Sequence, residues 1–237
     1  MGFDIRRICM GMLLFIVLVT LSGGTAPLGV EAQSSSPTWT KIRTTQEAPG
    51  GTHPMAYDSD RQKTVALSLI GQDDMAVWEY DGSNWTKKSA VEGFSSLAST
   101  SNMVYDAARK RMVVFGTMDY SNQDDPKALS ETWEYDGGRW QKKVTSNAPP
   151  PRQGYAMAFD SKRGRVVIFG GYVARPDGSR VLFNDTWEYD GNNWTQRSVN
   201  KSPSLRRQPA IAFDAARSLI VLFGGAGTGD NSSLLQD

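Results

Sequence analysis

Nearly the same nine residues occur three times in this chain, as VWEYDGSNW at 77–85, TWEYDGGRW at 132–140 and TWEYDGNNW at 186–194. The first tryptophans of these segments are spaced by 55 and 54 residues. Such regular self-similarity is typical of repeat architectures, in which each unit buries its apolar face against its neighbours. The repeat therefore constrains the fold more than any other feature of the sequence.

A second set of repeated residues alternates with the WEYDG segments along the chain. Aromatic-Asp pairs at 57–58, 105–106, 159–160 and 213–214 each precede an apolar run, at 64–67, 112–115, 166–169 and 219–223. Short runs of β-branched and aromatic residues separated by Asp, Gly and Asn indicate strands and turns. Each unit thus predicts four short strands: the aromatic-Asp run, the apolar run, the Trp-Glu-Tyr segment and the segment opened by the second tryptophan. No window after residue 32 predicts a long amphipathic helix.

The repeated turn motifs predict structure rather than chemistry. An Asp-x-x-Arg motif occurs in each unit, at 58–61, 106–109, 160–163 and 214–217. Its aspartate can accept hydrogen bonds from the following backbone, and we expect the ion pair to be exposed and worth about 1 kcal/mol at most. The Asp-Gly step of WEYDG favours a tight type I′ hairpin.

In the Trp-Glu-Tyr segment, Trp and Tyr share one face of a strand and Glu faces the other way. The aromatic face is either a platform for a sugar or peptide or a contact between neighbouring sheets, and recurrence once per unit favours the sheet contact. Glu79, Glu134 and Glu188 recur equally regularly, which favours structural roles. The Lys and Arg residues on the fourth strand place it at an outer edge. The repeated tryptophans are Trp78, Trp85, Trp133, Trp140, Trp187 and Trp194.

Units of this length, with glycines after the second strand and a tryptophan on the fourth, resemble the kelch repeat of β-propellers. The resemblance rests on the tyrosines and tryptophans of each unit and on Gly170, Gly171, Gly224 and Gly225; the doublet reads Ser68-Leu69 and Gly116-Thr117 in the first two units. It implies an all-β, kelch-type propeller of four-stranded antiparallel blades. About three and a half blades are expected, at 52–90, 100–145, 154–199 and 208–237, and residues 38–43 match a closing outer strand.

The two ends of the chain carry separate predictions. Arg6 and Arg7 precede an apolar run at 8–21, and Val30-Glu31-Ala32 resembles a cleavage site. This pattern predicts a signal peptide at 1–32 and a secreted, periplasmic or cell-surface domain at 33–237. The 14-residue apolar run is short for a membrane span, so none is expected after signal removal. The chain stops where the preceding unit continues into WEYDG, which predicts a fragment of a longer protein or, alternatively, closure by oligomerisation.

Composition limits the possible functions. The net charge is +1 without a basic block, which argues against nucleic-acid binding. The one cysteine, Cys9, lies in the predicted signal, and the one histidine, His53, stands alone. We therefore predict no catalytic residue, metal or cofactor, and a binding protein rather than an enzyme. The resemblance raises two enzymes of this fold, galactose oxidase and a sialic-acid mutarotase. The oxidase's cross-linking cysteine is missing after signal removal.

We expect function on the side of the blades that carries the second-to-third loops and the connections between blades, because variable loops on a rigid scaffold usually hold binding groups. Arginines near the propeller axis would grip a carboxylate or acidic sugar, although solvated loop charges are the alternative for each residue. The leading hypothesis is a binding or interaction module for a protein or glycan ligand. A carbohydrate-active enzyme is the alternative, and a purely structural surface protein is a third possibility. The candidate ligand contacts are Asp119, Tyr120, Arg152, Tyr172, Arg175, Arg180, Arg206 and Arg207.

Overall fold

The computed structural model describes residues 44–45, 54–70, 74–90, 101–119, 122, 127–228 and 234–235, which all belong to the compact unit Thr44–Asp237. These residues form strands, turns and loops, without a helix. The expected signal peptide at 1–32 and closing strand at 38–43 lie outside them.

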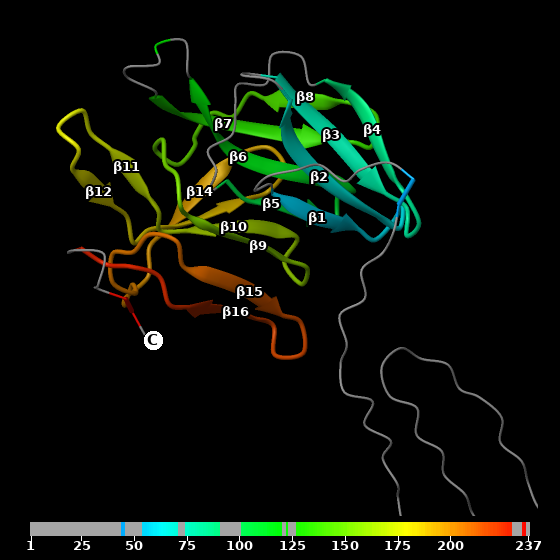
Figure 1. Cartoon of the computed structure of the whole chain (residues 1–237). Coiled ribbons are helices and arrows are strands. Elements are labelled where there is room, and N and C mark those ends of the chain that lie inside the picture. The colour runs from blue at the N-terminus through cyan, green and yellow to red at the C-terminus, as the bar shows by residue number, and fades with distance from the viewer. Residues whose placement is uncertain are drawn as a thin grey trace, which may run out of the picture. The chain divides into compact units, whose positions relative to one another are not determined.

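Within the described residues, three sheets contain four antiparallel strands each, and two further sheets contain two strands each (Figure 1). Blade 1 consists of β1 (Met55–Asp58), β2 (Lys63–Ile70), β3 (Asp74–Tyr80) and β4 (Trp85–Ala90). Blade 2 consists of β5 (Met103–Asp106), β6 (Arg111–Asp119), β7 (Lys127–Tyr135) and β8 (Trp140–Lys143). Blade 3 consists of β9 (Ala156–Asp160), β10 (Arg165–Phe169), β13 (Thr186–Tyr189) and β14 (Trp194–Arg197). The half-blade is β15 (Ala210–Asp214) and β16 (Leu219–Phe223), and an extra hairpin is β11 (Tyr172–Ala174) with β12 (Arg180–Leu182). The predicted four strands per unit are confirmed for the three complete blades.

The first strands lie innermost. β1 contacts β5, β5 contacts β9, and β9 contacts β15, so the first strands meet from one sheet to the next. The fourth strands β4, β8 and β14 lie at the opposite edges of their sheets. This order agrees with the placement predicted from the charged fourth strands.

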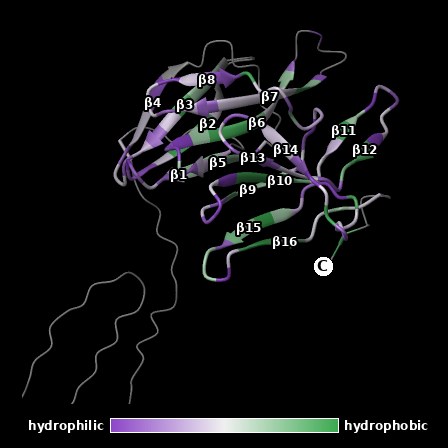
Figure 2. Ribbon diagram, turned by 180° about the vertical axis from the view of Figure 1, so that it is seen from behind, coloured by the Kyte–Doolittle hydropathy of each residue, from purple (hydrophilic) through white to green (hydrophobic). Residues whose placement is uncertain are grey.

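The core consists of two apolar layers, each between neighbouring blades, and Figure 2 shows that apolar residues concentrate in strands such as β6, β10 and β16. In the second layer, Trp194 is only 1% exposed and stacks on Tyr189 with ring centroids 5.0 Å apart. The repeated Trp and Tyr residues of blades 2 and 3 therefore join sheets, as the favoured interpretation predicts, whereas Trp78, Tyr80 and Trp85 of blade 1 belong to neither layer. The first layer contains Val65, Leu67, Met75, Val77, Met103, Met112, Val114, Trp133 and Tyr135; the second contains Val113, Phe115, Tyr155, Met157, Val166, Ile168, Trp187, Tyr189 and Trp194.

The repeated glutamates receive hydrogen bonds from the following blade. The Tyr135 hydroxyl donates to Glu79 Oε1 at 3.0 Å, and the Tyr189 hydroxyl donates to Glu134 Oε1 at 2.8 Å. Glu79 also accepts from Arg61 Nη1 at 2.5 Å and from Lys63 Nζ at 3.1 Å. Burial alone raises the pKa of Glu79, but these cationic donors lower that pKa overall. Each of these two glutamates thus links two sheets.

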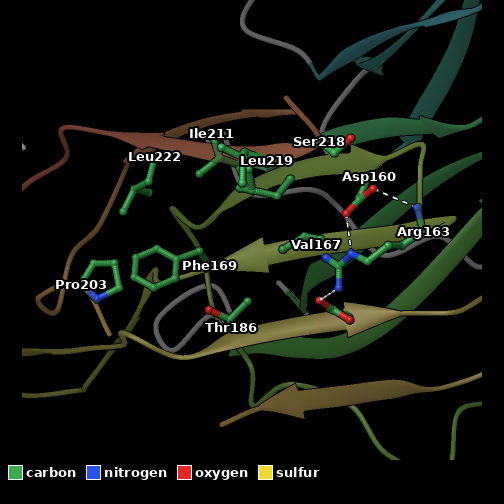
Figure 3. Close-up of a pocket in the computed structure, with 12 residues that line it drawn as sticks. Asp160, Arg163, Val167, Phe169, Thr186, Pro203, Ile211, Ser218, Leu219 and Leu222 are labelled. Atoms are coloured by element: carbon green, nitrogen blue, oxygen red, sulfur yellow. Dashed lines mark hydrogen bonds and ion pairs between the residues drawn. The ribbon is translucent and has the colours of Figure 1, made fainter. Parts of the chain in front are cut away.

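The Asp-x-x-Arg pairs are less exposed than expected. Asp58, Asp106 and Asp160 are 4%, 0% and 3% exposed, so the expected exposure is wrong for the aspartates of the first three units, whereas the paired arginine side chains are 29%, 31% and 47% exposed. Figure 3 shows the third of these pairs, in which Arg163 contacts Asp160. In the second unit the arginine also serves the interface between blades, because Arg109 Nη1 donates to the Gly164 carbonyl of the next blade at 3.0 Å. In the half-blade, the Arg217 side chain is 75% exposed, as expected.

Candidate functional site

The β11–β12 hairpin lies on the predicted binding side. It forms within the connection between β10 and β13 and projects from the end of blade 3 (Figure 1). At its tip, the Arg175 amide donates to the Ser179 carbonyl at 2.9 Å, and the Ser179 amide donates to Asp177 Oδ1 at 2.9 Å. At its base, Tyr172 and Gln153 exchange two backbone hydrogen bonds of 2.9 Å. The hairpin is therefore tied to the segment that leads into β9.

An arginine lies against a tyrosine on this hairpin. The guanidinium carbon of Arg180 is 5.3 Å from the ring centroid of Tyr172, a cation–π distance. Among the residues that the structure describes, none accepts a hydrogen bond from this guanidinium, and Arg180 is exposed. The Tyr172 ring therefore holds the guanidinium of Arg180 in place, and its N–H groups are open to a ligand.

Tyr172 has a polar neighbour from the next unit. A Cβ atom on Gly154 would lie 2.9 Å from Tyr172 Cε1 and 3.4 Å from Gln208 Cγ, so both side chains pack on this glycine. Gln208 Oε1 accepts a hydrogen bond from Arg207 Nη1 at 3.0 Å. Tyr172, Gln208 and Arg207 therefore form one continuous patch around Gly154, together with Arg180. We call these four side chains the Tyr172 patch.

Gln208 has an unusual backbone conformation. Its φ is +52°, at the position where the preceding unit has Gly154 with φ +61°. A left-handed conformation costs a residue with a Cβ about 1–2 kcal/mol. Such a cost tends to occur where a side chain serves a function. The sequence prediction missed this residue, because its position holds Thr52, Thr100, Gly154 and Gln208 in the four units and no repeated residue marks it.

Two predicted ligand contacts are buried instead. Arg152 is 1% exposed and its guanidinium holds Asp185 with two contacts of 2.5 and 2.9 Å. The same guanidinium lies 4.1 Å from the Phe183 ring centroid. Arg206 is fully buried and donates to the Gly224 carbonyl at 3.0 Å. Both arginines hold loop backbone in place and are closed to solvent, so we remove them from the candidate site.

The remaining candidates are spread over the same side. Asp119 ends β6 and is paired in register with Lys127 of β7. Arg175 is exposed near the tip of the β11–β12 hairpin. Tyr120 lies outside the described residues. The structure thus brings Tyr172, Arg180 and Arg207 into one patch.

The described residues contain neither a metal-binding cluster nor a membrane-crossing helix. In that part of the chain, no group of three or more His, Cys, Asp or Glu residues is arranged to hold a metal ion. Nor does it contain a helix of the length and apolarity needed to cross a membrane.

Comparison with known proteins finds partial relatives. No family model matches the chain. The flagellar outer arm dynein alpha chain of Chlamydomonas reinhardtii is 33% identical over 130 residues, which is 50% of this chain and 3% of that protein. Dynein regulatory complex subunit 7 of the same organism is 36% identical over 83 residues, 34% of this chain and 7% of that protein. The chain therefore spans only a small part of these relatives.

A solved structure gives the fold. The structure of YjhT matches with a TM-score of 0.54 at 13% identity, covering 82% of this chain and 65% of that one. At this identity the match concerns the fold alone. Together with the repeated four-stranded antiparallel sheets and their inner first strands, it shows that the chain has an all-β, kelch-type propeller fold.

Proposed function

We propose that this chain is a binding module and that the Tyr172 patch captures a protein or glycan ligand through a carboxylate group. The observation that carries the proposal is the Arg180 guanidinium, which lies on the Tyr172 ring with its N–H groups open to solvent. A guanidinium forms two parallel hydrogen bonds with a carboxylate, and a neighbouring aromatic ring offers an apolar surface. Because stacking restrains the arginine, little conformational entropy remains to be lost on binding.

Two further points support an interaction role. The hairpin is tied to the blade by backbone hydrogen bonds at its base, so the patch is presented on a rigid support. The two partial relatives are named as a dynein chain and as a subunit of a regulatory complex, both parts of larger assemblies. We also propose that the domain is exported, since the predicted signal peptide precedes it.

The test measures binding by the exported protein. Residues 33–237 are titrated by calorimetry with a sialylated and a uronate-containing oligosaccharide, their neutral counterparts, and a glutamate-rich peptide. We expect one of the acidic ligands to bind and its neutral counterpart not to bind. Arg180→Gln should weaken binding by about tenfold or more.

A matched control is available on the other side of the same blade. Lys162 is exposed in the β9–β10 turn, and Lys162→Gln removes one positive charge without touching the Tyr172 patch. Equal losses for both variants would mean that only overall charge matters, and this would overturn the proposed site. Failure of every acidic ligand to bind would overturn the proposed function.

A further inference from the structure

The β11–β12 hairpin has one strand edge with which no described residue pairs. β11 pairs with β12 on one side and, through Tyr172, forms a bridge to Gln153 on the other. Among the described residues, β12 pairs with β11 alone. Both strands lie in the connection between β10 and β13 of blade 3, and they project away from its four strands (Figure 1). Because all four strands of blade 3 are present, this open edge belongs to a complete blade.

The hydrogen bonds of the hairpin show which backbone groups point toward this edge. The Phe183 amide donates to the Gly171 carbonyl at 2.9 Å. In an antiparallel pair, hydrogen-bonded and non-hydrogen-bonded residue pairs alternate. Val181 is therefore the next residue bonded to β11. Arg180 and Leu182 direct their N–H and C=O groups to the open edge, where no described residue bonds to them.

The other edge of the hairpin shows how such groups are used. Tyr172 lies opposite Leu182 in the register and also directs its backbone groups away from the hairpin. There, Tyr172 and Gln153 exchange two hydrogen bonds of 2.9 Å. The same arrangement on β12 would serve two residues, Arg180 and Leu182. An antiparallel strand of about five residues is long enough to bond both.

The edge of β12 also lacks the protection that the fourth strands have. The fourth strands carry exposed positive charges, such as Lys142 and Lys143 on β8, and such charges discourage pairing with another chain. The one charged residue of β12 is Arg180, and its guanidinium carbon lies 5.3 Å from the ring centroid of Tyr172. Because Tyr172 belongs to β11, this guanidinium is drawn away from the open edge.

The register also fixes the side chains that an added strand would meet. Residues two apart, and residues directly opposite each other, share one face of a sheet, so Arg180 and Leu182 lie on the face of Tyr172. The hairpin carries two arginines, Arg175 and Arg180, against one aspartate, Asp177. Charge complementarity therefore selects an acidic residue opposite Arg180. The half-buried Leu182 favours an apolar residue opposite itself.

We propose that β12 binds an extended acidic segment of a partner protein as an added antiparallel strand. The segment carries an apolar residue opposite Leu182 and, two residues later, a glutamate or aspartate opposite Arg180. This inference rests on the proposed function, since the same guanidinium takes the carboxylate. It specifies a peptide rather than a glycan, because a glycan has no main chain whose N–H and C=O groups alternate at the spacing of a strand.

A designed peptide tests the proposal. The peptide Thr-Thr-Val-Thr-Glu-Thr-Thr, acetylated and amidated at its ends, is titrated into the protein and followed by amide NMR. Its β-branched residues favour an extended chain, and its glutamate is its one charge. We expect saturable binding of one peptide per chain. A counterpart with glutamine in place of the glutamate should bind about tenfold or more weakly.

Two methylated peptides separate strand pairing from charge attraction. Methylation of the glutamate's backbone nitrogen removes an N–H that faces β12, whereas methylation of the threonine before it removes one that points away. The first should weaken binding by about tenfold or more and the second by less than about twofold. Both peptides keep the same side chains and charge. Equal affinities for the two would overturn strand addition.

The protein offers the same test from its own side. The N–H of Leu182 is not used within the hairpin, so Leu182→Pro removes an outward donor at an edge position where proline is tolerated. This variant should bind the peptide about tenfold or more weakly, with amide exchange at Val173 and Val181 unchanged. In the wild type, bound peptide should slow exchange at Arg180 and Leu182. Protection elsewhere in place of these two amides would overturn the proposal.

The outcomes also separate this inference from the proposed function. If an acidic oligosaccharide binds through Arg180 and the peptide does not, strand addition is overturned and the proposed function stands. If the peptide binds but tolerates both methylations, the carboxylate is captured without strand pairing, and again only this inference fails. If no acidic ligand binds, both are overturned.

Discussion

In each WEYDG segment the tyrosine hydroxyl donates a hydrogen bond. Its contribution to stability depends on whether the acceptor is a buried glutamate of the preceding blade. Tyr135 donates to the buried carboxylate of Glu79, and Tyr135→Phe removes that donor while keeping the ring in the apolar layer. Hydrogen bonds to charged groups contribute about 1.5–3 kcal/mol, so we expect the free energy of unfolding to fall by about 2 kcal/mol. Urea unfolding monitored by tryptophan fluorescence measures this change.

Tyr80 supplies the matched control. It occupies the same position in blade 1, but its hydroxyl donates to the Gly82 carbonyl at 2.8 Å in an exposed setting. Tyr80→Phe should therefore change the free energy of unfolding by less than about 0.5 kcal/mol. Equal effects of the two substitutions would contradict the assignment of Glu79 and Tyr135 as a link between blades.

Buried carboxylates predict how stability depends on pH. Burial by itself raises the pKa of Glu79, Asp160 and Asp185, but hydrogen bonds from arginine lower each pKa below its ordinary value of 4.5 or 3.8. A lowered pKa in the folded state contributes stability that is complete above the unfolded value and is lost as pH falls through the folded value. The free energy of unfolding should therefore be nearly constant from about pH 7 to 5 and fall below about pH 4.5.

Glu79→Gln isolates one group in this dependence. The substitution removes the charge that Arg61 and Lys63 neutralise, so the variant should be less stable than the wild type at about pH 7. The difference should narrow as the pH falls below the unfolded value of about 4.3, because the unfolded wild-type chain then binds a proton that the folded glutamate, with its lowered pKa, resists. Urea unfolding across this pH range provides the comparison, and a constant difference would show that Glu79 does not contribute through its charge.

Arg152 shows why residue roles were harder to predict than residue positions. It precedes the inner strand β9, but its burial depends on Asp185 and Phe183, which lie more than thirty residues later. Local patterns do not contain that pairing. Gln208 was missed for a related reason: its position varies among the four units, and its left-handed backbone is visible only in the structure.

At the scale of elements, the glycine after the second strand has a steric cause. Gly170 has φ +67°, and a Cβ atom there would lie 2.7 Å from the carbonyl oxygen of Arg206, in the segment leading into the half-blade. Gly116 faces the Arg152 carbonyl in the same way, at 3.1 Å. The first glycine thus lets the backbone of the next blade pass close to the sheet.

Two glycine substitutions separate this contact from backbone strain. Gly178 also has positive φ, +81°, but a Cβ atom there would meet nothing within 4 Å. Gly178→Ala should lower the free energy of unfolding by about 1–2 kcal/mol through the left-handed backbone alone. Gly170→Ala should lower it by about 1–3 kcal/mol more, because it adds a clash with backbone. Thermal and urea unfolding of both variants give the difference, and equal losses would contradict the close-packing explanation.

Most strands were predictable because their signals are local and repeat. The aromatic-Asp pairs and the Asp-Gly turns mark where strands end, and the apolar runs mark the second strands. Because these signals recur in the same order in each unit, the units support one another's assignment. The β11–β12 hairpin was expected only as a loop. Its strands are three residues long, Tyr172–Ala174 and Arg180–Leu182, and they occur in one unit, so no comparison within the chain reveals them.

At the scale of the whole molecule, the predicted signal peptide makes a direct test of export. Expression of the full chain in a secreting host should yield a processed protein whose first residue is Gln33, since cleavage is predicted after Ala32. N-terminal sequencing and intact mass determine the start. A protein that keeps residues 1–32 and stays in the cell would contradict the predicted location, while leaving the propeller fold unaffected.

A repeat protein distributes its stability along the chain according to how many neighbours each blade has. Blade 2 contributes to both apolar layers, whereas β16 pairs, within the described part of the chain, with β15 alone and exposes Leu219 and Phe223. Local opening costs least where few apolar contacts hold a strand. We therefore expect amide hydrogen exchange to be slowest in β6 and fastest, among the second strands, in β16.

The aligned strand β10 serves as the internal control, because Arg165–Phe169 repeats the pattern of Leu219–Phe223 but pairs with β13 on its other edge. If β16 exchanged as slowly as β10, stability would not follow the number of neighbouring strands, and the half-blade would have to be held by contacts other than the sheet pairing described above.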